Sequence, residues 1–237
     1  MSCPFCKTSE FTLIGDKEDW RWVRCDNCEL AYINPLPTDE QLRDFYSKYP
    51  ANYKNVKNSQ RKISRFKRKL WPITLMTKGR RFLDVGCNTG FAAEAARQLG
   101  CDSHGIDLSD EAIEIASGLY PKCHYYHETI QSFSTRGVQF DIVSCSEVIE
   151  HLNDIDSFIS SLSSLVAKNG ILYLTTPDAG HFRVPNDFLS WKDVTPPEHA
   201  ILFQKKHVKS LLEKSGFRVK YFLPMIKPSI RVIAEKL

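Results

Sequence analysis

Strand-like and helix-like patterns of apolar residues alternate along the chain from about residue 80 onward. Short apolar runs predict strands at 81–85, 102–106, 122–126, 140–145 and 171–175, with two more near 218–223 and 230–235. Helical spacing predicts helices at 91–99, 110–119, 154–167 and 205–215 between them. Ser109 is a good N-cap, and Gly100, Gly216 and the run Lys168-Asn-Gly170 end three of these helices. This alternation predicts an α/β fold with a mostly parallel sheet covered on both faces.

The first 80 residues have a different pattern. Short strands are predicted at 11–14 and 20–24. The run Asn34-Pro-Leu-Pro37 then predicts a turn, and Thr38 caps a short helix that ends near Tyr46. A module this small needs a metal to hold it together.

Two Cys-x-x-Cys pairs supply that metal site. Cys3 and Cys6 are followed, after 18 further residues, by Cys25 and Cys28. Two such pairs provide the four thiolates of a closed tetrahedral zinc site, with a disulfide or redox role as the alternative. Because cysteine takes all four positions, no coordination site is left for a catalytic water, and we expect structural Zn²⁺. The expected parts are a zinc-ribbon module at 1–36, a helical, basic connecting or lid segment at 37–78, and the α/β domain at 79–237.

The amino-acid composition of the whole chain agrees with the predicted globular fold. Of the 237 residues, 42% are hydrophobic and 25% charged, as in ordinary globular proteins. No apolar run approaches the roughly 18 residues of a membrane span, and MSCPFCKTSE lacks the apolar stretch of a secretory signal. The other four cysteines are scattered as single buried hydrophobes: Cys87, Cys101, Cys123 and Cys145. We expect a cytoplasmic protein that does not bind membranes.

A strongly basic segment departs from this ordinary composition. The net charge is +4, yet Lys54 to Arg81 contains eleven Lys or Arg and no Asp or Glu. Such a segment can contact phosphate, a nucleotide diphosphate, RNA or an acidic surface. Alternatively it is a solvated helix whose apolar side packs while its cations face water. That apolar side would be Ile63, Phe66, Leu70 and Trp71. Both interpretations stay open.

A glycine-rich turn joins the first strand of the α/β domain to its helix. The run is Phe82-Leu-Asp-Val-Gly-Cys-Asn-Thr-Gly90. Glycines let the backbone approach a ligand closely, and the helix N-terminus offers free N–H groups. Asp107 ends the next strand 21 positions after Gly86, a spacing that suits a carboxylate bound to a ribose diol. The sequence therefore predicts a nucleoside-bearing cofactor.

The same residues carry a family resemblance. Leu83-Asp-Val-Gly-Cys-Asn-Thr-Gly90 resembles motif I of the class I S-adenosylmethionine-dependent methyltransferases, and Gly105-Ile-Asp-Leu-Ser109 resembles their ribose-binding motif. Residues 140–152 and 169–177 resemble the fourth- and fifth-strand motifs, so the likeness covers about 80–237. The ribbon resembles the N-terminal module of some bacterial members, many of which act on small molecules or sugars. The resemblance implies a Rossmann-like seven-stranded sheet that ends in an antiparallel hairpin.

The resemblance also implies roles in binding S-adenosyl-L-methionine. Asp84 would hold the methionine end, and Gly86, Cys87 and Gly90 would line it through backbone contacts. Asp107 would bind the ribose and Leu108 the adenine, with Thr129 and Ile130 at the adenine edge. The sequence departs from the family at Thr129, where members often have Asp, and at Asn88, where many have Gly. Asn tolerates a left-handed backbone, so we expect binding to survive.

Candidates for a proton-transfer step follow the fourth strand. In ubiquinone-biosynthesis-like O-methyltransferases, the Glu-x-x-Glu-His that matches Glu147, Glu150 and His151 can hold a divalent cation or supply a base. Alternatively, His151 caps a helix and Glu147 orients the loop. His199, in Pro196-Pro-Glu-His199, is a base, an acceptor-positioning residue or a loop tether. Trp191 either walls the acceptor or packs on the core. The remaining histidines have no partner pattern and read as structural: His104, His124, His127, His181 and His207.

Three functions are weighed. The first is a methyltransferase acting on an O or C atom of a small molecule, such as a phosphate- or nucleotide-bearing sugar or a natural-product intermediate. The second is an RNA methyltransferase, but few aromatics interleave the basic segment, and Ser144-Cys-Ser-Glu147 is no base-methylation signature. The third is a non-catalytic adaptor, which the intact cofactor residues disfavour. Nothing in the sequence indicates an oligomeric state.

Overall fold

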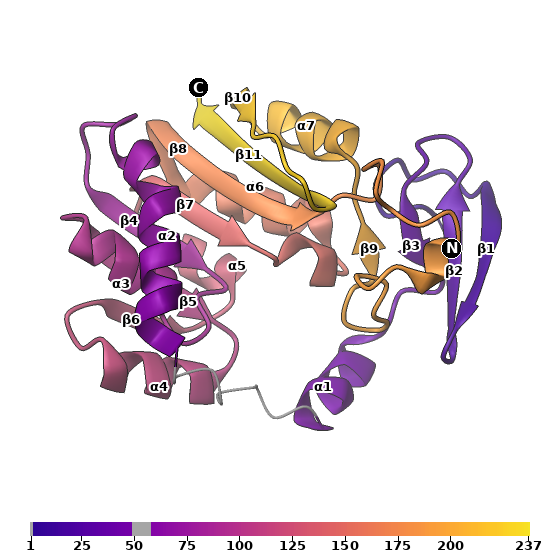
Figure 1. Ribbon diagram of the computed structural model, residues 1–237, viewed down its shortest axis with the longest axis horizontal. Helices are drawn as coiled ribbons and strands as arrows, with labels where there is room; N and C mark the ends of the chain where they lie inside the picture. Colours follow the sequence, from indigo (N-terminus) through magenta and orange to yellow (C-terminus); the bar gives the residue numbers. More distant parts are fainter. Residues whose placement is uncertain (1, 49–57) are drawn as a thin grey trace.

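A seven-stranded sheet forms the centre of the computed structural model, which describes residues 2–48 and 58–237 (Figure 1). Its order is β10-β11-β8-β7-β4-β5-β6. The strands are β4 (Arg81–Val85), β5 (Asp102–Asp107), β6 (His124–His127), β7 (Phe140–Ser146), β8 (Val166–Pro177), β10 (Phe217–Phe222) and β11 (Ser229–Lys236). β4 to β8 pair in parallel, whereas β11 is antiparallel to both β8 and β10. The predicted α/β fold with its C-terminal hairpin is confirmed.

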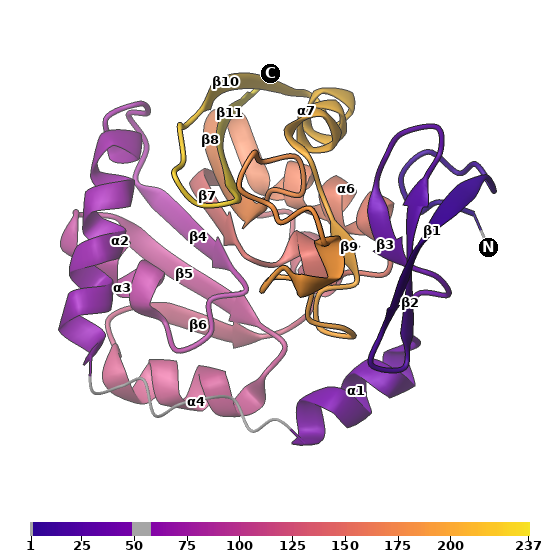
Figure 2. The ribbon, with the colours of Figure 1, turned by 45° about the vertical axis from the view of Figure 1, so that its right-hand side comes forward.

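Helices cover both faces of this sheet (Figure 2). One face carries α2 (Ser59–Thr74), α3 (Phe91–Gln98) and α4 (Asp110–Leu119); the other carries α5 (Ile130–Ser134), α6 (Ile155–Leu165) and α7 (Lys205–Lys214). Side chains alternate between the faces because a strand has a period of two. Phe82 and Tyr173 pack with α2 and α3, whereas Leu83 and Leu172 pack with α6 and α7. Among the described residues, no helix has the length and apolar character needed to cross a bilayer.

A second sheet joins the N-terminal residues to the α/β domain. It contains β1 (Phe11–Lys17), β2 (Trp20–Cys25), β3 (Ala31–Ile33) and the two-residue β9 (Ile201–Leu202), in that order. β9 comes from the segment between β8 and α7, and it lies between the large sheet and the ribbon (Figure 2). Ala31 pairs with Leu202 and Tyr32 with Ile201. Trp22 and Val23 belong to the same apolar core as α6 and α7. Strands from both predicted parts share this sheet, and the predicted domain boundaries stay predictions.

Two details of the predicted elements differ. α6 ends at Leu165, and β8 begins at Val166 instead of near Ile171. A register shift against β7 takes up the extra residues, with Asn169 at φ 60°.

Trp71, expected to pack, is 58% exposed, and Ile73 is buried instead. At 100° per residue, Ile73 lies on the side of Ile63 and Leu70, whereas Trp71 points away from it. α1 (Asp39–Lys48) precedes α2, and two members of the basic segment, Lys54 and Lys57, lie outside the described residues.

Candidate active site and cysteine centre

Backbone N–H groups of the turn between β4 and α3 donate hydrogen bonds to the end of β5. Asp107 accepts from the Asn88 N–H through Oδ2 at 2.8 Å and from the Ser109 N–H through Oδ1 at 2.9 Å. Gly86 has φ 72°, and a Cβ added there would lie 2.6 Å from Val148 Cγ2. Only glycine fits that position without strain. Asn88 has φ 46°, a left-handed backbone that asparagine tolerates.

The other predicted methionine-end residues lie in this turn. Asp84 is buried at 5% exposure, and burial raises the pKa of its carboxyl to about 7. The N–H groups of Gly86 and Cys87 both donate to the Ile106 carbonyl, at 2.9 and 3.0 Å. A ligand would therefore meet these two residues through their carbonyl and Cα surfaces. The Cys87 side chain is buried, and burial raises the pKa of its thiol.

The predicted ribose and adenine residues lie at the ends of β5 and β6. Leu108 is 68% exposed, so its side chain is accessible to a ligand. Thr129 is the N-cap of α5, and its Oγ1 accepts from the Ser132 N–H at 3.0 Å. The Ile130 side chain is 5% exposed and packs in the core. Contact with an adenine at Thr129 and Ile130 would therefore use mainly the backbone, and all these roles stay predictions.

A cavity of about 390 Å³ opens between α2 and this turn. Asp84, Gly86 and Asn88 line one side, and Ser146 and Glu147 line another at the end of β7. Its remaining lining includes four side chains of α2: Lys62, Arg65, Phe66 and Lys69. This volume is in the range of small-molecule sites, and it lies at the carboxyl ends of parallel strands, where such sheets bind ligands.

The two glutamates after β7 differ in surroundings. Glu147 has φ 56°, and its Oε1 accepts from the Thr175 hydroxyl at 2.7 Å. Glu150 lies in the 3₁₀ helix η2 (Ile149–His151) with no exposed surface, and its Oε2 accepts from the Thr176 hydroxyl at 2.9 Å. Burial and the nearby Glu147 charge raise the pKa of Glu150 well above its usual value. Burial therefore disfavours the ionised form of Glu150, whereas Glu147 lines the cavity.

His151 and His199 lie together although 47 residues separate them in the chain. Their ring centroids are 4.9 Å apart. His151 Nδ1 is 2.7 Å from the Glu198 carbonyl, and His199 Nδ1 is 2.7 Å from the Asp193 carbonyl. Since a carbonyl only accepts, Nδ1 carries the proton in both rings, and the neutral ring has its lone pair on Nε2. Burial and the neighbouring His199 lower the pKa of His151 to about 4. The structure thus joins two of the three predicted catalytic residues.

This depressed pKa predicts a loss of stability in acid. Between pH 6.5 and about 4 the unfolded chain binds a proton at His151 that the folded chain does not bind, so stability falls as pH falls. Across that window we expect the lower pKa of folded His151 to reduce the free energy of unfolding by about 3 kcal/mol. Urea unfolding of the wild type and of His151→Gln at pH 7 and pH 4 checks this. Parallel pH dependences would contradict this expectation. Loss of zinc from the cysteine cluster in acid is common to both proteins and cancels in the comparison.

A candidate metal-binding group partly overlaps this site. Ligand atoms of Glu150, His151 and His199 all lie within 4.8 Å of one another, and among the described residues Glu147 is not part of that group. A divalent cation here stays a prediction. Trp191 is 3% exposed and packs against Phe188, whose ring also contacts Trp22. The structure therefore favours the core-packing alternative for Trp191.

The four N-terminal cysteines form one cluster. Cys3 Sγ lies 3.7 Å from Cys28 Sγ, Cys6 Sγ lies 3.4 Å from Cys25 Sγ, and all four sulfurs lie within 4.8 Å of one another. Bonds of about 2.3 Å to a tetrahedral zinc ion place sulfurs about 3.8 Å apart, so the residues fit that ion. All four thiols are free rather than joined in disulfides. Burial raises the pKa of Cys3 to about 11, and a bound cation would offset that cost of ionisation.

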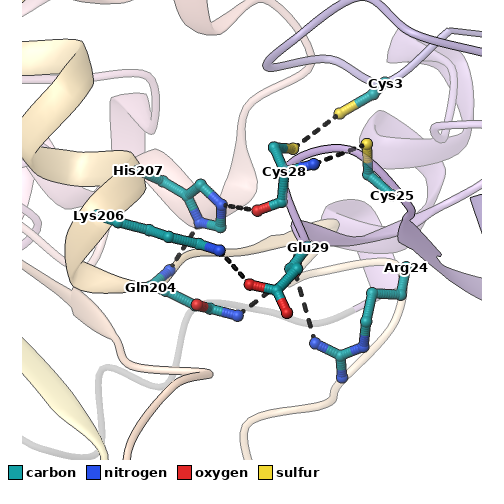
Figure 3. Close-up of polar contacts among 8 residues, drawn as sticks. All are labelled: Cys3, Arg24, Cys25, Cys28, Glu29, Gln204, Lys206 and His207. Carbon is teal, nitrogen blue, oxygen red and sulfur yellow. Dashed lines mark hydrogen bonds and ion pairs between the residues drawn. The ribbon is translucent and has the colours of Figure 1, made fainter.

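A histidine from α7 holds this cluster against the α/β domain (Figure 3). His207 Nδ1 accepts from the Gln204 N–H at 3.0 Å, and its Nε2 donates to the Cys28 carbonyl at 2.7 Å. Lys206 forms an ion pair with Glu29 beside it. Two opposite backbone partners fix the neutral tautomer of His207, and burial lowers its pKa. Sequence reasoning had no signal for this role, because Cys28 and His207 are 179 positions apart.

His104 and His124 also have partners that the sequence did not reveal. Their rings stack at 4.7 Å, and His104 Nε2 lies 3.3 Å from Asp102 Oδ2. The three residues could hold a metal, but they lie at the start of β5 and β6, away from the carboxyl ends of the strands.

Comparison with known proteins places these features in a family. Residues 56–221 match the model of a methyltransferase domain. A ubiquinone biosynthesis O-methyltransferase of Bordetella avium is 36% identical over 119 residues, which is 47% of each chain. One from Sinorhizobium fredii is 29% identical over 152 residues, covering 60% of this chain and 61% of the relative. The chain therefore spans about half the length of the curated relatives it matches.

Solved structures share the fold at low sequence identity. A magnesium protoporphyrin IX methyltransferase of Synechocystis, solved with bound S-adenosylhomocysteine, has a TM-score of 0.58 at 17% identity over 75% of this chain and 83% of that one. An S-adenosylmethionine-dependent methyltransferase of Archaeoglobus fulgidus has a TM-score of 0.59 at 19% identity over 73% of this chain and 94% of that one.

Proposed function

This chain belongs to the methyltransferase domain family, and from that premise we propose that it transfers a methyl group from S-adenosylmethionine to an oxygen atom of a small molecule. The observation that carries the proposal is the cavity of about 390 Å³ with the glycine-rich turn on one side and Glu147 on the other. The likeness to O-methyltransferases over about half their length supports oxygen over carbon as the attacking atom.

The residues around the turn fit the cofactor. Asp107 uses each carboxylate oxygen for one backbone N–H, and a carboxylate has lone pairs left for a ribose diol. The exposed Leu108 next to it would cover one face of the adenine. Asp84 and the carbonyl side of Gly86 would hold the methionine end. When bound, S-adenosylmethionine supplies the electrophilic methyl group.

The protein's own part is to orient the acceptor, exclude water and take up a proton. We assign proton uptake to the His151–His199 pair. In the Nδ1–H tautomer, His199 Nε2 can accept the proton of an acceptor hydroxyl. The low pKa of His151 keeps that ring neutral, so the pair carries at most one positive charge. Glu147 would accept a hydrogen bond from the same hydroxyl and orient it. We expect the reaction to take place in the cytoplasm.

An acceptor screen tests the reaction. Phenols, sugars and nucleotide sugars, and total RNA are incubated in parallel with radiolabelled S-adenosylmethionine. We expect transfer to a small-molecule hydroxyl. Transfer only to RNA would favour an RNA methyltransferase that uses the ribbon and the basic segment. If calorimetry detects no binding of S-adenosylmethionine or S-adenosylhomocysteine, both enzyme functions fail and the non-catalytic adaptor remains.

The assigned ribose contact predicts a loss of cofactor affinity. Asp107→Asn keeps the shape but removes the charge, so S-adenosylhomocysteine should bind about 10- to 100-fold more weakly, the worth of one charged hydrogen bond. Asp110→Asn is the matched control, since Asp110 is an exposed carboxylate three residues later. Calorimetry measures both, and thermal melting confirms folding. Equal affinity in the wild type and Asp107→Asn would refute the contact.

A further inference from the structure

The cavity wall formed by α2 carries more positive charge than its surroundings neutralise. Lys62, Arg65 and Lys69 line the cavity from three successive positions along one side of the helix. Among the residues that the structure describes, no carboxylate forms an ion pair with any of the three. The facing acids are Glu147, bound to the Thr175 hydroxyl, and Asp84, whose pKa is raised to about 7. Cations therefore outnumber carboxylates there.

Two of these cations are held over aromatic rings instead of being fully solvated. Lys62 Nζ lies 4.8 Å from the centroid of Phe91, and Lys69 Nζ lies 5.0 Å from that of Phe66. Phe91 and Phe66 also line the cavity. Burial, with Arg231 and Arg65 nearby, lowers the pKa of Lys69 to about 8. Lys69 is half-buried with two other cations near it, an arrangement that a bound anion would stabilise.

The cofactor alone does not balance this charge. Its methionine part carries one carboxylate and one ammonium, and its sulfonium adds a further positive charge. Even if one cation of α2 pairs with that carboxylate, at least two others remain along the wall. Arg61 and Arg68 belong to the same helix but do not line the cavity. The charge excess therefore belongs to the cavity side of α2.

We propose that Arg65 and Lys69 of α2 form a subsite for an anionic group of the methyl acceptor, a phosphate or a carboxylate. This inference rests on the proposed function and narrows its substrate class. The guanidinium of Arg65 can bind such a group through two parallel hydrogen bonds, and Lys69 adds a point charge. The anion would hold the acceptor beside Glu147 and the bound cofactor.

Titration of inorganic phosphate into protein saturated with S-adenosylhomocysteine tests the subsite. Saturation satisfies the cofactor's own carboxylate, so any phosphate bound reports the remaining cations. We expect wild-type protein to bind phosphate, and Arg65→Met and Lys69→Met to bind it at least about tenfold more weakly. Arg68→Met removes the same charge from the exposed side of the same helix and should change binding less than about twofold. Absence of phosphate binding to the wild type overturns the proposal.

A second arm separates the acceptor's anion from the cofactor's carboxylate. S-adenosylhomocysteine carries that carboxylate, whereas 5′-methylthioadenosine does not. We expect Arg65→Met and Lys69→Met to leave both affinities within about threefold. If both variants weaken only S-adenosylhomocysteine, the cations serve the cofactor and the proposal is wrong.

Failure of the proposed function is distinguishable from failure of the subsite. If the wild type binds no S-adenosylhomocysteine, the methyltransferase assignment fails, and the phosphate titration is run on the protein alone. Loss of phosphate binding in Arg65→Met and Lys69→Met but not in Arg68→Met would still support an anion site. A single-stranded RNA that loses affinity equally in Arg65→Met and Arg68→Met would show that the whole helix meets a polymer, which overturns the subsite.

Discussion

Replacing Cys25 with serine is expected to abolish tight zinc binding and to lower turnover at least about 100-fold, while S-adenosylhomocysteine still binds. The metal contributes on the order of 10 kcal/mol to the folding of a zinc-held module, so losing one thiolate unfolds the ribbon. β3 then loses its place beside β9. The Ile33 N–H donates to the Ala200 carbonyl at 2.9 Å, and the Ala200 N–H donates to the Glu150 carbonyl at 2.9 Å.

This chain of backbone bonds ends at the residues next to His199 and His151. Disorder in the ribbon should therefore displace the two rings, and a 1 Å displacement of a catalytic group costs about 100-fold in rate. The cofactor turn between β4 and α3 makes none of these bonds and is held by Asp107 instead. Cofactor affinity should for that reason survive.

Three measurements check the expectation. Metal analysis should find one zinc ion per wild-type chain and none in Cys25→Ser. Tryptophan emission should shift to longer wavelength, because unfolding of the ribbon exposes Trp22 and Trp191 to solvent. Their side chains are 0% and 3% exposed in the folded protein. Cys101→Ser is the control, since Cys101 is a buried cysteine outside the cluster and should keep zinc and turnover. Full turnover in Cys25→Ser without zinc would show that catalysis does not depend on the ribbon. Loss of cofactor binding in this variant would show that the whole fold depends on the ribbon.

Replacing His199 with glutamine is the second substitution for which we expect a large loss of turnover. Turnover on the acceptor found in the screen should fall about 10²- to 10⁴-fold, the usual contribution of a positioned base, and S-adenosylhomocysteine should bind as before. Glutamine can still bond to the Asp193 carbonyl through its amide, so the loop should keep its course. His181→Gln is the matched control from the same connecting segment: His181 bonds to the Met225 carbonyl and lies outside the site.

The double variant His151→Gln, His199→Gln decides whether the two rings act as a unit. If the two rings act together on the proton taken from the acceptor, the double variant should be only slightly slower than the worse single variant. Independent roles would instead multiply the two losses. The pH profile of kcat/KM gives a further check, because removal of the base should flatten its acidic limb. Normal turnover in both single variants would remove the proton-transfer assignment.

Much of the architecture follows from the sequence by itself. The alternation of strand and helix periods predicted the parallel sheet, because such periods depend on neighbouring residues alone. The two Cys-x-x-Cys pairs placed two sulfurs on each tight turn, and the glycine-rich run from Phe82 to Gly90 indicated a ligand-binding turn because glycine lets the backbone approach closely. These signals led to the family, and the family model confirmed it.

Only the tertiary structure decided which distant residues meet. β9 is too short for any pattern, so its pairing with β3 was not predictable, and that pairing connects the ribbon to Glu150. Glu150 and Glu147 are alike in sequence, but the fold buries Glu150 completely and places Glu147 in the wall of the cavity. The contacts of His199 with His151 and of His207 with Cys28 depend on loop paths that no local period encodes. The sequence determined the elements because their causes are local, whereas packing across long loops assembled the site.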